Sequence, residues 1–190
     1  MAFSESVFSE YEVKQIGVKV GSAETATVVD CVGSMSEEME VKTIVKNCRG
    51  VPVKTRTRGT GSGTLNLSVH IPWSLYIAMY NMDQDGFVDG VAAYGTESLH
   101  PEIVLTALVE DEDGNEMYKA FPKTTLTSGP NPSTTNGEET VAEVQLTLAV
   151  SPDENGYGLY QAVVSDLPSE GNVRTNWMIG FTPELIRTNA

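Results

Sequence analysis

Apolar and polar residues alternate without a break along the segment TLNLSVHI, and this period of two limits what the chain can fold into. One face would carry Leu65, Leu67, Val69 and Ile71, and the other Asn66, Ser68 and His70. Successive side chains of a strand point to opposite faces, so the pattern predicts a strand with one buried face. A helix would scatter the same apolar residues around its circumference.

Most of the chain follows similar patterns, cut by Gly, Asn and Asp turns such as DEDGNE and PDENGYG. Alternation from Val141 to Val150 predicts a long strand with an irregularity near Ala142. RGTGSGTL precedes a strand and lacks Gly-Lys-Ser/Thr, which favours a hairpin tip or a bend in a long hairpin over a phosphate loop. We also expect strands in EVKQIGVKV, ATVVDCVG, MEVKTIVKN, VPVKTRTR, FVDGVAAY, EIVLTALVED, NEMYKAFP, TTLTS and GLYQAVVSD.

One helix is expected in IPWSLYIAMY, where Pro72 suits a first helical position. Its apolar residues cover more than one face, so the helix either packs only on its own sheet or also touches a neighbouring subunit, through Trp73 and Tyr76. A shorter helix is expected near NWMIGFTPELI. The predicted fold is therefore mainly β: a β-sandwich or barrel of antiparallel strands with one flanking α-helix. We expect a single domain over residues 1–190, with a flexible N-terminal segment at about 1–10 and a mobile loop at 128–139.

The stretch NMDQDGFVDGVA resembles a calcium loop, because Asn81, Asp83, Asp85 and Asp89 take ligand positions around Gly86. An EF-hand requires a bidentate Glu at its twelfth position, and that position is Ala92. The segment VAAYG that follows also lacks helical character. The pattern favours an acidic turn that leaves a helix, and we expect no metal site and no cofactor.

Catalytic chemistry has little material in this chain. It contains two His residues, and no nucleophile elbow or His/Cys metal spacing appears. We therefore expect no enzyme. Cys31 and Cys48 are expected to be reduced and mostly buried. No targeting segment or membrane anchor is visible, and a net charge of −14 should repel nucleic acid and anionic membranes.

Charge is segregated along the chain. Six of the 12 basic residues fall within the 17 residues from Lys42 to Arg58, and ten acidic residues lie between Asp83 and Glu116. Lys54, Arg56 and Arg58 alternate, so they share one strand face. That face is either solvated, or docked on acidic turns of an identical neighbour, or, as the weakest option, bound to nucleic acid. The subunit-interface candidates are Arg49, Lys54, Arg56, Arg58, Asp83, Asp85, Asp89, Glu110, Asp111, Glu112, Asp113, Trp73 and Tyr76.

The order of these segments resembles the major tail proteins, or tail tube proteins, of long-tailed bacteriophages that infect Gram-positive hosts. The likeness runs through VKTIVKNCRGVPVKTRTRGTGSGTLNLSVHIPWSLYIAMYNM, DEDGNEMYKAFP, TSGP, VAEVQLTLAVSPDENGYGLY and WMIGFTPEL. It covers most of the chain, from about Tyr11 to Arg187.

This resemblance implies a structural virion protein that forms hexameric rings stacked into a tail tube. The implied partners are copies of itself, a tape-measure protein, a tail terminator and a distal tail protein, and DNA would pass through the lumen without specific binding. Assembly in the bacterial host cytoplasm and a place in the virion tail are also implied. The alternative is a β-sandwich binding or adhesion module of a phage tail or fibre, for which Tyr157 and Tyr160 would be the candidate aromatic platform.

Overall fold

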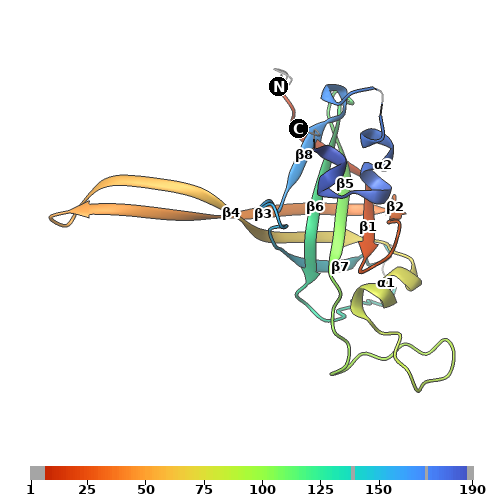
Figure 1. The fold of residues 1–190 in the computed structure, drawn as a ribbon. Helices are drawn as coiled ribbons and strands as arrows, with labels where there is room; N and C mark the ends of the chain where they lie inside the picture. Colours follow the sequence, from red (N-terminus) through yellow and green to blue (C-terminus); the bar gives the residue numbers. More distant parts are fainter. Residues whose placement is uncertain (1–6, 138–139, 170, 188–190) are drawn as a thin grey trace.

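The computed structural model describes residues 7–137, 140–169 and 171–187, and these form a mainly β fold (Figure 1). The predicted N-terminal segment and the predicted mobile loop lie partly outside this range, at residues 1–6 and 138–139. The strands are β1 (Glu10–Val20), β2 (Thr27–Val29), β3 (Val32–Cys48), β4 (Val51–Val69), β5 (Ile103–Asp111), β6 (Glu116–Leu126), β7 (Val144–Val150) and β8 (Tyr160–Val163). The helices are α1 (Trp73–Tyr80) and α2 (Val173–Gly180), with short 3-10 turns at Val164–Asp166 and Pro183–Ile186.

All strand pairs are antiparallel, and the order across the sheet is β2-β1-β5-β6-β7-β4-β3, with β8 beside β6. The sheet folds over so that β3 and β4 cross the β5–β6 layer (Figure 1). The predicted β-sandwich with a flanking helix is confirmed. Two helices are present, and the second coincides with the shorter helix expected near the C-terminus.

The main core lies between the two layers, and β4, β5 and β7 contribute alternate residues to it. Leu65, Leu67 and Val69 are at most 2 % exposed, as the alternation of TLNLSVHI predicts. Their partners across the layers include Leu105 and Phe121, both fully buried. Alternation therefore identifies the buried face of this strand correctly.

A second, smaller core lies on the outer face of β6, under α2. Trp177 is buried there, stacks on Tyr118, and donates a hydrogen bond from Nε1 to the Lys119 carbonyl oxygen over 3.1 Å. On the other face of the same strand the Lys119 side chain points into the main core. It is 1 % exposed and forms ion pairs with Glu37 of β3, at 2.8 Å, and with Glu10 of β1. This buried cation on β6 therefore connects β1 and β3, which are not neighbours in the sheet order.

The structure corrects four predictions. FVDGVAAY is not a strand: residues 87–94 form a bend, a turn and irregular chain, and Val88 and Val91 are exposed rather than packed on a sheet. The long strand expected from Val141 begins only at Val144, and Val141 is 82 % exposed. Cys31 and Cys48 are exposed rather than buried. TTLTS is also not separate, since β6 runs continuously from Glu116 to Leu126.

Candidate subunit interface

We call the two-layered body of the curled sheet the barrel. The outer halves of β3 and β4 form a hairpin that projects far from it (Figure 1). We call residues 41–60 the arm. Every residue of the arm is exposed, although its strands keep continuous antiparallel pairing. The hairpin tip is the turn at Arg49 and Gly50, both with positive φ. RGTGSGTL is therefore a bend within β4, where Gly61 has φ +80° and lies against Pro152 and Gly156.

Cross-strand register sorts the arm's side chains onto two unlike faces. Residues directly opposite each other share a face, and the pairs Lys42–Arg58, Ile44–Arg56 and Lys46–Lys54 alternate with Thr43–Thr57 and Val45–Thr55. The first face carries five cations and one Ile; we call it the basic face. The second, uncharged face carries Thr and Val, and its Thr43 and Thr57 hydroxyls are 3.1 Å apart. Lys54, Arg56 and Arg58 thus share a face as predicted, and Lys42 and Lys46 join them.

The sequence around the arm contains no neutralising charge. No Asp or Glu occurs between Val41 and Met82, so the arm carries a net charge of +6. The remaining chain holds the other six bases and all 26 acidic residues, a net charge of −20. Among the described residues, none of the six arm cations forms an ion pair. Like charges directly opposite on neighbouring strands are destabilising, so the basic face carries an electrostatic cost in the free subunit.

The two predicted acidic turns differ in how far their carboxylates are already engaged. In the 110–116 turn, Glu110 pairs with Lys14 at 2.6 Å. Asp111 is buried and accepts hydrogen bonds from the backbone N–H groups of Asp113 and Asn115 and from the Asn115 side chain. The Asn115 side chain and these N–H groups hold the pKa of Asp111 below its usual value. Glu112 and Asp113 remain exposed.

The 83–89 turn is different, because Asp83, Asp85 and Asp89 are exposed and make no hydrogen bond or ion pair with any other described residue. Gly86 and Gly90 have positive φ, so the segment turns twice within five residues. Nowhere in the described ranges do three or more His, Cys, Asp or Glu side chains converge as metal ligands would.

The predicted helix contacts divide between inside and outside. Tyr76 is buried and stacks on Trp73, with ring centroids 5.4 Å apart. Trp73 itself is 61 % exposed, so of these two candidates it is the ring that another molecule can reach. Beside α1, Phe87 and Val88 are also exposed, by 56 % and 77 %.

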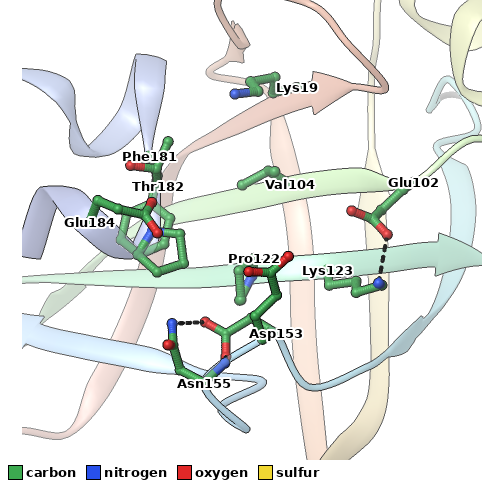
Figure 2. Close-up of a pocket in the computed structure, with 12 residues that line it drawn as sticks. Lys19, Glu102, Val104, Pro122, Lys123, Asp153, Asn155, Phe181, Thr182 and Glu184 are labelled. Atoms are coloured by element: carbon green, nitrogen blue, oxygen red, sulfur yellow. Dashed lines mark hydrogen bonds and ion pairs between the residues drawn. The ribbon is translucent and has the colours of Figure 1, made fainter.

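A polar pocket of about 310 Å³ lies elsewhere. It is lined by β1, β5 and β6, by residues 153–155 after β7, and by residues 181–184 after α2. Figure 2 shows Lys123 joined to Glu102, at 3.2 Å, and Asn155 joined to Asp153. Asp153 also accepts hydrogen bonds from the Tyr160 hydroxyl and from the N–H of Tyr157. Lys123, Glu102 and Asp153 are thus engaged within the chain, and the lining also includes Lys19, Phe181 and Thr182.

Comparison with known proteins gives no matching family model and no matching curated protein. Among solved structures, the chain is similar to one from an extracellular contractile injection system, the PVC sheath–tube complex in its extended state. The TM-score is 0.48 and the identity 16 %, over 80 % of this chain and 91 % of that one. It is also similar to one from the anti-feeding prophage cap, described as a tube terminating cap, with TM-score 0.46 and 14 % identity over 84 % and 97 % of the two chains.

A third similar chain comes from the anti-feeding prophage baseplate, with TM-score 0.43 and 9 % identity over 87 % of this chain and all of that one. Scores below 0.5 at such identities describe a partial likeness of fold, and nothing of function follows from them. In the described ranges no helix has the length and apolar content needed to cross a membrane.

Proposed function

We propose that this chain is a structural subunit that polymerises with copies of itself into the tube of a phage tail or a related tail-like machine. The observation that carries the proposal is the arm. It is a two-stranded ribbon that projects from the barrel, exposed at every residue, and it carries six cations on a protein whose remaining residues sum to −20. The sequence resemblance to tail tube proteins described above supports the same role.

The physical chemistry of the arm favours a partner. An isolated two-stranded hairpin is marginal in water, and this one also places Lys42 opposite Arg58 and Lys46 opposite Lys54. Its Val51 and Val53 side chains are 61 % and 57 % exposed. A partner that is acidic and partly apolar would relieve both costs. A second copy of this chain meets that description and is present at equal concentration.

The contact is head-to-tail, since the arm of one copy meets a different surface of the next. Heterologous contacts generate rings when the rotation closes and filaments when it does not. Beyond Val41 the arm reaches roughly 25 Å, at about 3.3 Å per residue of strand. That reach can join neighbours within a ring or between stacked rings, and we propose hexameric rings stacked into a hollow tube.

The net charge suits a conduit for DNA. Each basic contact to a phosphate adds affinity through counterion release, so a lumen that binds DNA at many subunits would arrest it. An acidic wall avoids this, and screening over about 8 Å at physiological salt confines the repulsion to a thin layer. We propose that the arm cations form ion pairs in subunit contacts, so that the wall of the lumen keeps an excess of acidic residues. A tape-measure protein, a terminator and a distal tail protein are the proposed further partners.

The test is charge reversal on the arm. Arg56→Glu with Arg58→Glu should leave a folded subunit, with unchanged circular dichroism, that no longer forms rings or tubes by electron microscopy. A matched control, Lys19→Glu with Lys123→Glu, makes the same charge change on the barrel and should still polymerise. Normal tubes from the arm variant would refute the assignment of the arm. Wild-type protein that stays monomeric under every assembly condition would refute the function itself.

A binding or adhesion module is the other function considered, and the structure offers it little. Such a module needs an exposed aromatic platform. Tyr157 is 58 % exposed, but Tyr160 on β8 packs against Phe181 and donates its hydroxyl to Asp153. Only one of the two predicted rings is exposed, so the platform expected at Tyr157 and Tyr160 does not form.

A further inference from the structure

A groove of about 450 Å³ lies between α1 and the segment that follows it. One wall is the outer side of α1, with Trp73, Ile77 and Ala78. The other is formed by Asp83, Gly90 and Val91. The helical wall is apolar, while the opposite wall begins at the acidic 83–89 turn. The groove therefore has two unlike sides.

Exposed apolar residues lie on the groove wall and on the segment that leads to it. Trp73 is 61 % exposed and Val91 45 %, and Phe87 and Val88 lie on the same turn. Contiguous exposed apolar surface rimmed by polar residues marks interaction sites. In the described part of the chain no segment covers it.

More carboxylates are free beside the groove than on the other acidic turn, where Glu112 and Asp113 are exposed but Glu110 and Asp111 are engaged. Asp83, Asp85 and Asp89 have no partner among the described residues, whereas Glu110 is paired with Lys14 and Asp111 holds its own turn together. A cation that approached the 110–116 turn would compete with Lys14 for Glu110. A cation that approached the 83–89 turn would meet three free carboxylates.

The two faces of the arm complement the two sides of this groove. Its uncharged face presents Thr43, Val45 and Thr55, and its basic face presents Lys54 and Arg56. Building on the proposed self-assembly, we propose that the arm of one copy docks in the α1 groove of a second copy. The uncharged face lies on Trp73 and Ile77, and the basic face meets Asp83, Asp85 and Asp89. The occupant is thus a second copy of this chain, chosen by charge and by apolar content together.

Cys48 provides a native probe of this contact. It pairs with Val51 next to the Arg49–Gly50 tip, on the part of the arm that would enter the groove, and it is exposed in the free subunit. In a Cys31→Ser background, Ala78→Cys places a second exposed thiol on the helical wall of the groove. Mild oxidation with copper phenanthroline and dioxygen during assembly should join Cys48 of one copy to position 78 of the next. A ladder of cross-linked oligomers on a non-reducing gel is the expected result.

The matched control is Asp113→Cys in the same background, which places the thiol on the competing acidic turn. We expect at least a several-fold higher cross-linked fraction for position 78 than for position 113. An equal or higher yield at position 113 would overturn the groove assignment.

A charge exchange gives a second measurement that does not depend on thiol geometry. Lys54→Glu, Arg56→Glu and Arg58→Glu together should abolish assembly, and adding Asp83→Lys, Asp85→Lys and Asp89→Lys should restore it. The control adds Glu112→Lys and Asp113→Lys to the same arm variant and should not restore it. Restoration by the control, or none by the 83–89 reversals, would overturn the docking site. Wild-type tubes in that case would leave the proposed function standing, whereas the absence of wild-type assembly would remove both.

Discussion

The two halves of β4 lie in different environments. The inner half is part of the barrel, and the outer half is part of the arm. From Gly63 to Val69 it pairs with β3 on one side and β7 on the other, and Leu65 is fully buried. From Val51 to Thr60 it pairs with β3 alone, and Val53 is 57 % exposed. Both halves alternate apolar or β-branched residues with polar ones. The inner half alternates to build a core, whereas the outer half alternates to separate cations from an uncharged face.

The difference teaches that the arm adds almost nothing to the stability of the subunit. Burial of apolar surface contributes about 25 cal/mol per Å², and every residue of the arm stays exposed within its own chain. Substitutions in the two halves should therefore act on different measurements. Those in the barrel should change unfolding, and those in the arm should change assembly.

The largest effect on unfolding is expected at Lys119, which joins the base of the arm to the barrel. Removal of one partner from a buried ion pair costs about 3–5 kcal/mol, because the remaining charge is left uncompensated. Lys119→Ala would leave Glu37, which is 18 % exposed, beside Glu10. Urea unfolding should show a loss of this size. The double variant Lys119→Met with Glu37→Leu should recover most of it; an unchanged loss would show that packing rather than charge is responsible.

The next effect compares the two halves of β4 directly. Leu67 is 2 % exposed, and Leu67→Ala in a core costs about 2–5 kcal/mol. Val53→Ala should change the free energy of unfolding by no more than about 0.5 kcal/mol, as for other surface positions. Sedimentation of the assembled material should show the reverse order, with Val53→Ala weakening polymerisation. If Val53→Ala destabilised the subunit by 1 kcal/mol or more, the arm would have contacts on the barrel that this comparison denies.

The same contrast explains what the sequence reveals. Alternation identified the buried residues of TLNLSVHI, and Pro72 marked the start of α1. Alternation also assigned FVDGVAAY to a strand, because Val88 and Val91 have β-branched side chains whether or not a neighbouring strand exists to pair with them. Local pattern reports the preference of a segment, and pairing depends on partners distant in the chain.

The candidate interface was predictable in part for a related reason. The charges of Lys54, Arg56 and Arg58 alternate in the sequence, so their shared face follows from strand geometry. That Lys42 and Lys46 lie on the same face depends on cross-strand register, which the sequence does not state. The engagement of Glu110 by Lys14 likewise joins β5 to β1, and so only the structure distinguishes the two acidic turns.

A smaller effect concerns acid. The arm has no carboxylate, so the response of the subunit to low pH must come from the barrel. Burial alone would raise the pKa of Asp153, but hydrogen bonds from Tyr160, Tyr157 and Asn155 lower it below the usual value. A lowered pKa stabilises the fold above about pH 3.9, the unfolded value, and this stabilisation is lost as pH falls through the folded pKa.

Urea unfolding of wild type at pH 5 and pH 3 should therefore show a loss of stability that is smaller in Asp153→Asn. The arm variant Thr57→Ala contains no titratable change and should keep the wild-type difference between the two pH values. A wild-type pH difference in Asp153→Asn as well would place the acid response in other carboxylates of the barrel.

The smallest effect on the free energy of unfolding is predicted for the largest change in sequence, removal of the arm. Val41 and Gly59 are paired across the two strands, so an Asn-Gly turn in place of residues 42–58 gives a two-residue hairpin of standard geometry. Because those residues bury nothing in the barrel, the free energy of unfolding should stay within about 0.5 kcal/mol of wild type. The shorter connection also lowers the entropic cost of closing the hairpin, but this cost changes by only about 0.6 kcal/mol per doubling of loop length. The denaturant slope should be nearly unchanged, since it scales with the surface exposed on unfolding.

The shortened subunit should remain monomeric at concentrations where wild type polymerises. If it assembled as wild type does, the barrel alone would hold the contacts between copies, and the separation of the two halves of β4 into a stability half and an assembly half would fail.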